Sequence, residues 1–263
     1  MRVALVEMTS VPELGKNIEI IISFIETASK NKADMVLFPE NCSCLAPSKI
    51  MLKYASVDQD HPVLKAAITA AKTNRIYVLL GSIAVFPNYK IIDKMQNRSI
   101  LIDKKGNVIA IYNKINMFDA KISNKEIYRE SDLYIAGKNL SLVDTEFGII
   151  GLTICFDLRF PELYKELSNR GASIITVPSA FTRTTGYAHW EVLLRARAIE
   201  NSVWILAPAQ VGNHYGNRHT WGHSMIIDPW RKIIEKNDGS KQIIYADLDI
   251  DKSIQTKKVF GKL

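Results

Sequence analysis

Cysteine is scarce in this 263-residue sequence, which contains only three, and glycine and proline are also infrequent at 13 and 9 residues. So few cysteines exclude a disulfide-stabilised scaffold, and so little glycine and proline exclude a collagen-like or low-complexity chain. No apolar run approaches the ~20 residues that span a bilayer. Residues 1–13 meet an acid at Glu7 before any long apolar stretch, which predicts a first strand and not a signal peptide. We therefore expect a cytoplasmic protein whose thiols stay reduced.

Acidic residues are outnumbered by basic ones, 27 to 34, which gives a formal net charge of +7. Basic pairs such as Lys104-Lys105, Arg231-Lys232 and Lys257-Lys258 are scattered, and no basic stripe is interleaved with aromatic residues. That pattern is typical of a solvated surface and indicates neither nucleic-acid nor membrane binding. We expect the positive balance to attract small anionic molecules.

Apolar runs of strand length alternate with helical patterns along the chain. Ile18, Ile21 and Ile25 follow the spacing of one helix face, and helices are also expected at Pro161–Asn169 and Trp190–Glu200. Short polar turns join pairs of expected strands as hairpins: Arg98–Ile102 with Val108–Tyr112, Leu140–Asp144 with Ile149–Cys155, and Ser224–Ile227 with Lys232–Glu235. The alternation implies parallel strands and the hairpins add antiparallel ones, so we expect an α/β fold with a mixed sheet. One domain over residues 1–250 is expected, followed by a polar, basic arm or tail at residues 251–263.

Three chemically active side chains follow the ends of apolar runs. Glu40 follows Met35–Phe38, Lys114 follows a run that ends at Asn113, and Cys155 stands between a strand and a helix. Each of the three alone is more often an ordinary surface or packing residue. If their strands are neighbours, however, a glutamate that takes the thiol proton, a lysine that stabilises an oxyanion and a nucleophilic thiol meet at one sheet edge. The sequence therefore predicts an acyl-transfer site there.

Three segments resemble, in order and spacing, the signature segments of the nitrilase superfamily of carbon–nitrogen hydrolases: Pro39-Glu40, Tyr112–Lys114 and Cys155–Glu162. The resemblance implies a four-layer α-β-β-α sandwich of two mixed sheets. It implies hydrolysis of a non-peptide amide with no metal and no organic cofactor. It also implies a homodimer or a higher homo-oligomer.

The same resemblance implies a role for each site residue. Cys155 is the implied nucleophile, Glu40 the general base and Lys114 the cation that stabilises the oxyanion, together with the backbone N–H of Phe156. The family carries a second glutamate in a short element that Tyr128–Ser131 matches, so Glu130 is implied to orient Lys114 and the substrate amide.

Two C-terminal segments, residues 179–201 and 222–230, resemble the Nit branch of the superfamily. They imply a small anionic 2-oxo amide as substrate, with the amide of deaminated glutathione favoured. The alternatives are 2-oxoglutaramate or 2-oxosuccinamate, the substrates of an omega-amidase, another small amide or a nitrile, and a catalytically silent binding protein. The expected substrate-binding residues are Arg159, Phe181, Thr182, Arg183, Thr185 and Tyr187, although a structural ion pair is an equal alternative for Arg159.

Two further features bear on these expectations. His214, His219 and His223 lie close together in an expected loop, but their spacing matches no standard zinc pattern, so no metal site is expected.

The sequence also departs from the family pattern twice. Phe118–Ser123 lacks a Pro-Gly pair that is frequent after the lysine, and Arg231 occupies a turn position where glycine is usual.

Overall fold

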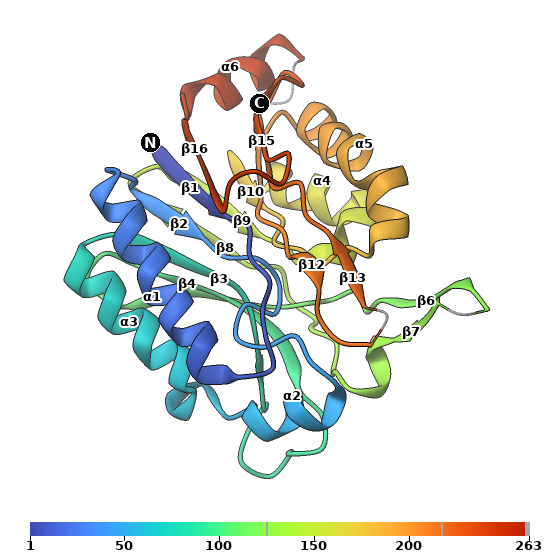
Figure 1. The fold of residues 1–263 in the computed structure, drawn as a ribbon. Coiled ribbons are helices and arrows are strands. Elements are labelled where there is room, and N and C mark those ends of the chain that lie inside the picture. Colours follow the sequence, from blue (N-terminus) through green and yellow to red (C-terminus); the bar gives the residue numbers. More distant parts are fainter. Residues whose placement is uncertain (125, 217, 261–263) are drawn as a thin grey trace.

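The computed structural model describes residues 1–124, 126–216 and 218–260, and their strands form two six-stranded mixed sheets (Figure 1). The first sheet has the order β16-β1-β2-β3-β4-β5, and its strands are β1 (Arg2–Val6), β2 (Met35–Leu37), β3 (Tyr77–Val85), β4 (Gln96–Ile102), β5 (Val108–Asn113) and β16 (Ile243–Asp247). The second has the order β15-β14-β11-β10-β9-β8, with strands β8 (Leu142–Thr145), β9 (Gly148–Leu152), β10 (Ile174–Thr176), β11 (Trp204–Ala207), β14 (Met225–Ile227) and β15 (Ile233–Lys236). In each sheet three central strands are parallel and the flanking strands antiparallel.

Helices cover the outer face of each sheet and complete four layers. Helices α1 (Leu14–Lys30) and α3 (Pro62–Asn74) lie on the first sheet, and α4 (Pro161–Asn169) and α5 (Arg183–Asn201) lie on the second (Figure 1). Strand alternation explains the layering, because successive side chains point to opposite faces of a sheet. Val3 and Leu5 pack in the core between the sheets, whereas Ala4 and Val6 pack beneath the helices. The expected α-β-β-α sandwich is confirmed.

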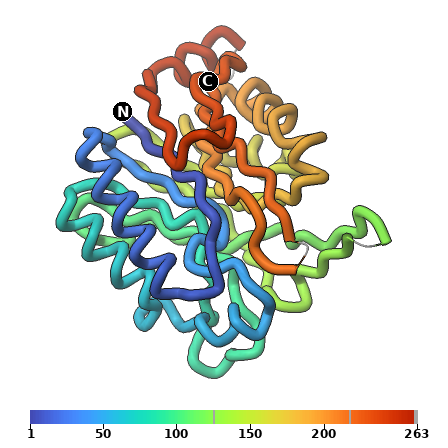
Figure 2. The backbone as a smooth tube through the Cα atoms, viewed as in Figure 1, coloured from blue at the N-terminus to red at the C-terminus, as the bar shows by residue number. Residues whose placement is uncertain are grey.

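The two ends of the described chain lie together. Strand β1 pairs antiparallel with β16, from Arg2 opposite Asp247 to Val6 opposite Ile243, as the tube in Figure 2 shows. Beyond β16, helix α6 (Asp251–Val259) occupies most of the expected arm, and its Lys257 Nζ donates to the Ala172 carbonyl at 2.8 Å. Residues 261–263 of that arm lie outside the described residues.

Several expected boundaries are wrong. The strand expected to reach Cys155 ends at Leu152, and Cys155 instead begins a 3₁₀ turn, η3 (Cys155–Arg159). Helix α5 begins at Arg183, seven residues before the expected start at Trp190, because the Thr182 hydroxyl caps it by accepting from the Thr185 N–H.

Other elements were not anticipated at all. Helix α2 (Ser48–Tyr54) and the 3₁₀ turns η1 (Asp58–Asp60) and η2 (Glu130–Asp132) belong to this group. A hairpin of β6 (Asp119–Ser123) and β7 (Glu126–Arg129) fills the segment that lacks Pro-Gly. The histidine segment, expected to be a loop, contains a second hairpin of β12 (Val211–Asn213) and β13 (His219–Trp221).

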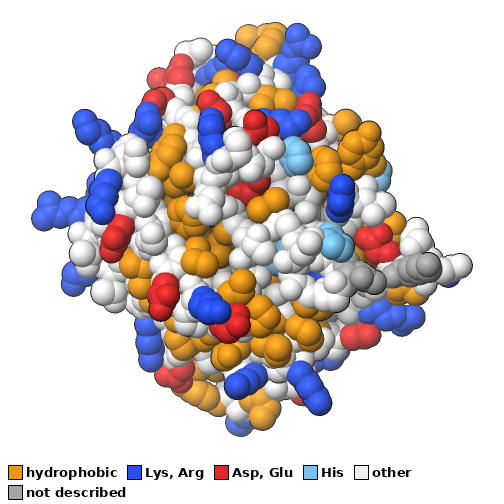
Figure 3. All heavy atoms as spheres, viewed as in Figure 1, with side chains coloured by type: hydrophobic (Ala, Val, Ile, Leu, Met, Phe, Trp, Pro, Cys, Tyr) orange, Lys and Arg blue, Asp and Glu red, His pale blue; other side chains and the backbone are white. Residues whose placement is uncertain are grey.

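Two observations concern the surface charge and the length of the helices. On the face drawn in Figure 3, lysine and arginine side chains are interspersed with acidic ones and form no continuous stripe. Among the described residues, no helix has the length and apolar character that crossing a membrane requires.

The two sheets approach each other closely at Gly81 of β3. A Cβ atom at this position would lie 1.8 Å from the Phe38 carbonyl oxygen and 2.4 Å from the Pro178 Cβ. Phe38 follows β2 and leads to Glu40, while the Pro178 carbonyl accepts a hydrogen bond of 2.9 Å from the Cys155 N–H. The missing side chain of Gly81 therefore lets two segments that carry site residues come together from different sheets.

Candidate active site

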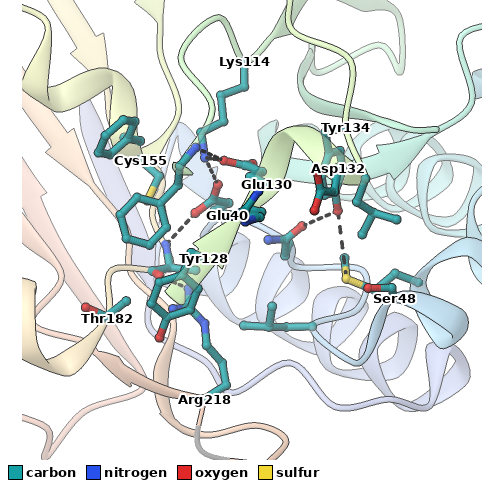
Figure 4. A pocket seen from close by; sticks show the side chains of 18 of the residues that line it. Glu40, Ser48, Lys114, Tyr128, Glu130, Asp132, Tyr134, Cys155, Thr182 and Arg218 are labelled. Atoms are coloured by element: carbon teal, nitrogen blue, oxygen red, sulfur yellow. Dashed lines mark hydrogen bonds and ion pairs between the residues drawn. The ribbon is translucent and has the colours of Figure 1, made fainter. Parts of the chain in front are cut away.

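The three side chains expected at strand ends meet in one place. Glu40 follows β2, Lys114 follows β5, and Cys155 begins η3 shortly after β9, and all three line the same cavity (Figure 4). They are buried, with 3%, 2% and 8% of their surfaces exposed, respectively. Two sheets contribute to the site, so the convergence depends on the face-to-face packing of the sandwich.

Lys114 lies between two carboxylates. Its Nζ is 2.8 Å from Glu40 Oε1 and 2.8 Å from Glu130 Oε2. The Asn97 Nδ2 donates to Glu40 Oε1 at 2.9 Å and to Glu130 Oε1 at 3.1 Å. The second Glu40 oxygen, Oε2, accepts from the Ala180 N–H at 2.8 Å. Both carboxylates are thereby fixed in position by charge-assisted hydrogen bonds.

Cys155 stands on a sharp turn with a backbone φ of 49°, a conformation that costs energy for a residue with a side chain. Asp157, two residues later, supports this turn, since its Oδ2 accepts from the Ile154 N–H at 2.9 Å and from the Tyr112 hydroxyl at 2.8 Å. Its Oδ1 accepts from the Asn116 N–H and side-chain amide at 3.0 and 2.8 Å. A strained strand-to-helix turn of this kind exposes a nucleophile beside free backbone N–H groups.

Burial and the neighbouring charges set the protonation states. Burial raises the pKa of Cys155, the Glu40 carboxylate raises it further, and the Lys114 ammonium only partly opposes them. Burial also acts to raise the pKa of Glu40, but the Lys114 charge and hydrogen bonds outweigh it, so that pKa is lowered. Burial opposes the charge on Lys114, yet Glu130 and Glu40 hold its pKa well above the usual value. The resting site thus combines a neutral thiol, a carboxylate ready to accept its proton and an ammonium group.

The cavity next to Cys155 has a volume of about 660 Å³. Arg159, Phe181, Thr182 and Thr185 line it, as do Phe156 and Glu130. Arg183 and Tyr187 do not line it, which corrects their expected position. Both lie on the solvent side of α5, one helical turn apart, and the Tyr187 side chain is 81% exposed with its ring edge against Trp221.

Arg159 projects its guanidinium over aromatic rings. Its Cζ lies 5.8 Å from the Phe156 centroid and 5.7 Å from the Phe181 centroid, and one Nη atom is 3.1 Å from His189 Nδ1. Within residues 1–124, 126–216 and 218–260, no carboxylate forms an ion pair with Arg159. The structural ion pair considered for this arginine is therefore not formed in that part of the chain.

The sequence analysis assigned no role to several residues of the site. Asn97 and Asp157, the second of which falls inside a signature segment, do not line the cavity but hold its residues in place through hydrogen bonds. Tyr128, Tyr134 and Arg218 line the cavity. Arg218 lies in the segment that contains His214, His219 and His223.

The histidines of that segment are each engaged in hydrogen bonds. His214 Nε2 is 2.8 Å from the Thr220 hydroxyl, and His223 Nδ1 is 2.8 Å from the Trp221 carbonyl. His219 Nδ1 contacts the Asn213 side-chain oxygen. Among the residues described, no cluster of three or more histidine, cysteine or acidic side chains has the arrangement of a metal site.

Comparisons with known proteins show what this chain is similar to. The family model described as carbon-nitrogen hydrolase matches residues 2–258. A protein named deaminated glutathione amidase from Yersinia enterocolitica is 42% identical over 241 residues, which are 89% of this chain and 82% of that relative. A protein of the same name from Synechocystis is 38% identical and covers 99% of this chain and 96% of its own length.

Solved structures show the same fold. The C. elegans NitFhit protein superposes with a TM-score of 0.90 at 33% identity over 100% of this chain, and the chain spans 64% of that longer protein. Saccharomyces cerevisiae Nit3, described as a member of branch 10 of the nitrilase superfamily, superposes with a TM-score of 0.87 at 29% identity, covering 98% and 93% of the two chains.

Proposed function

Because this chain belongs to the carbon–nitrogen hydrolase family and is an amidase, we propose that it hydrolyses the amide bond of deaminated glutathione, using Cys155 as nucleophile. The products are 2-oxoglutarate and cysteinylglycine. The observation that carries the proposal is the buried Lys114 ammonium between Glu40 and Glu130, beside the Cys155 thiol.

In the first half of the reaction, Glu40 accepts the thiol proton as the Cys155 sulfur attacks the amide carbon. The negative charge that develops on the carbonyl oxygen is stabilised by Lys114 and by the Phe156 N–H. The tetrahedral species collapses, the C–N bond breaks, and the proton held by Glu40 passes to the departing amine. A thioester between Cys155 and the 2-oxoglutaryl group remains.

In the second half, Glu40 removes a proton from a water molecule that attacks the thioester. The C–S bond breaks, the sulfur regains the proton, and 2-oxoglutarate leaves. Glu130 keeps Lys114 charged and directed at the oxyanion throughout. Each side chain ends in its starting protonation state, so the cycle requires neither metal nor organic cofactor.

The cavity supports the choice of an anionic substrate. We propose that Arg159 binds the 2-oxo acid carboxylate, because its guanidinium is held over Phe156 and Phe181 on the same turn as Cys155. Thr182 and Thr185 offer hydroxyl groups on the same wall, where they would orient the acyl group. The name that the Yersinia and Synechocystis relatives carry supports deaminated glutathione as this substrate.

The test is a comparison of kcat/KM on deaminated glutathione and on 2-oxoglutaramate, measured through the release of 2-oxoglutarate. We expect the native enzyme to favour deaminated glutathione. We expect Cys155→Ala to lose activity on both substrates, and Cys42→Ala, which removes another buried thiol, to retain it. A large preference for 2-oxoglutaramate would identify an omega-amidase instead, and turnover by Cys155→Ala would exclude the mechanism.

We also propose that the enzyme is a cytoplasmic homodimer or higher homo-oligomer. The exposed side chains of Val192 and Ile199, seven residues apart and so on the same face of α5, are 68% and 43% accessible and supply an apolar surface for self-association. The free thiols of Cys42, Cys44 and Cys155 fit a reducing compartment. Analytical ultracentrifugation of the native chain and of Val192→Glu tests the assembly, since the substitution should shift the sedimentation toward the monomer.

A further inference from the structure

A second guanidinium enters the cavity from an element far from the nucleophile. Arg218 lies at the turn between β12 and β13, and in Figure 4 it lies beyond Tyr128 from Lys114 and Cys155. Arg159, in contrast, shares the short turn η3 with Cys155. An acyl group bound to Cys155 is therefore within reach of Arg159, whereas Arg218 faces a different part of the cavity.

The Arg218 side chain is held in place. The Nη2 atom donates a hydrogen bond of 2.6 Å to the Ala180 carbonyl, and the Cζ lies 4.9 Å from the Tyr128 ring centroid. The backbone is fixed as well, because the Arg218 N–H donates to the Tyr215 carbonyl at 2.8 Å and its carbonyl accepts from the His214 N–H at 3.1 Å. The positive charge is thus preorganised before any ligand arrives.

Part of the bonding capacity of this guanidinium is unused. The Nη1 atom is buried and has no hydrogen-bond partner within the described part of the chain. Nor does Arg218 form an ion pair with any carboxylate described there. Glu126, on the neighbouring strand β7, accepts instead from the Tyr128 hydroxyl at 3.1 Å and from the Thr184 hydroxyl at 3.0 Å. Arg218 therefore lines the cavity as a cation that no carboxylate of the described residues neutralises, and such a cation can bind an anionic acceptor through charge-assisted hydrogen bonds.

An aromatic wall connects the two arginines. The Phe156 ring, beneath Arg159, lies 5.1 Å from the Phe118 ring, which in turn lies 4.9 Å from the Tyr128 ring beneath Arg218. An extended substrate that follows this wall meets a guanidinium at either end, with Cys155 next to the Phe156 end. The wall therefore suits a molecule with two carboxylates separated by a mostly uncharged segment.

We propose that Arg218 binds a carboxylate on the amine side of the scissile bond and so selects amides whose leaving group is itself anionic. The inference rests on the proposed function, because it takes Arg159 to bind the acyl end. In deaminated glutathione the second carboxylate is that of the terminal glycine. 2-Oxoglutaramate has no such group, so Arg218 contributes to the preference between the two substrates.

The test uses deaminated glutathione and an analogue in which the glycine carboxylate is replaced by a carboxamide. We expect native kcat/KM to favour the free acid by about tenfold, mainly through KM, a ratio in the range that one charged contact supplies. Arg218→Gln should remove this preference and leave kcat/KM on the carboxamide analogue within about threefold of native. Arg129→Gln, which removes an exposed arginine that also lines the cavity, should keep the preference.

The outcomes separate the inference from the proposed function. Equal native rates on the acid and its carboxamide, or a preference that survives Arg218→Gln, would overturn the role of Arg218 while leaving the amidase assignment intact. An equal loss on both substrates would show that Arg218 only supports the Ala180 segment. Native turnover of 2-oxoglutaramate without turnover of deaminated glutathione would reject the proposed substrate and this role together. Retained turnover of 2-oxoglutaramate by Arg218→Gln would show that the variant is folded.

Discussion

The side-chain amide of Asn97, on β4, donates a hydrogen bond of 2.9 Å to Oε1 of Glu40, which follows β2 on the other side of β3. The same side-chain amide also donates a hydrogen bond of 3.1 Å to Glu130 Oε1. The backbone carbonyl of Asn97 accepts a hydrogen bond of 2.9 Å from the Lys114 N–H. One residue of β4 thus positions both carboxylates and the backbone of the lysine between them. We infer that Asn97 is a positioning residue that keeps Glu40 ionised.

This role predicts a change in pH dependence. Glu40 must be ionised to accept the thiol proton, and the Lys114 charge and hydrogen bonds lower its pKa from the usual glutamate value, so native kcat/KM should stay level into the acid range. Asn97→Leu removes a donor to the carboxylate and should raise the Glu40 pKa, which moves the acid limb upward by about one pH unit. The measurement is kcat/KM against pH for both proteins.

Ser99→Ala is the matched control for that experiment. Ser99 lies two residues further along β4 on the same face, and its hydroxyl is buried without a hydrogen-bond partner in the described part of the chain. The acid limb of Ser99→Ala should coincide with that of the native enzyme. An unchanged acid limb in Asn97→Leu would contradict the positioning role.

Lys114 should matter for stability as well as for catalysis. Lys114→Met leaves the buried carboxylate of Glu40 and the partly buried one of Glu130 without their shared cation, and we expect the free energy of unfolding to fall by about 3–5 kcal/mol. Adding Glu130→Gln removes one of the two charges and should recover part of this loss. Urea denaturation of the single and double variants provides the values. Equal stability of the two variants would show that repulsion between the carboxylates is not the cause.

We expect that replacing Arg231 with glycine will stabilise the turn in which it lies. Its backbone φ is 107°, where a side chain is strained and glycine is not. Arg231→Gly should raise the free energy of unfolding by about 0.5–1 kcal/mol. Arg231→Ala shortens the side chain but retains Cβ, so it should bring no such gain. If both substitutions act alike in urea titrations, the side chain and not the backbone is responsible.

The elements that position Glu40, Lys114 and Cys155 could be anticipated because their signals are local. Apolar runs predict buried strands, and a polar side chain directly after a run is expected at a sheet edge. The layer count could not be derived in this way. It depends on which strand faces which across the core, and the close approach at Gly81 becomes evident only when Phe38 and Pro178 are brought together.

The expectations that proved wrong concern segments whose local sequence signals are weak or are overridden by contacts with distant residues. Helix α5 begins at Arg183 because Thr182 caps it, although the first helical residues are polar and look like a loop. The β6–β7 hairpin alternates between exposed and half-buried residues and contributes little to the core, so its strands lack the longer apolar runs that mark the buried strands of the two sheets. Arg218 has no signal of its own, since its importance comes from contacts with Ala180 and Tyr128, which are distant in sequence.

The central claim is that a thioester forms on Cys155 during amide hydrolysis. The most direct test is mass spectrometry of enzyme that is acid-quenched during turnover of deaminated glutathione, followed by peptide mapping. We predict a 2-oxoglutaryl adduct on the peptide that contains Cys155, lost after the substrate is exhausted and absent from Cys155→Ala. Rapid turnover with no adduct at any quench time, or an adduct on Cys42 or Cys44 instead, would contradict the account.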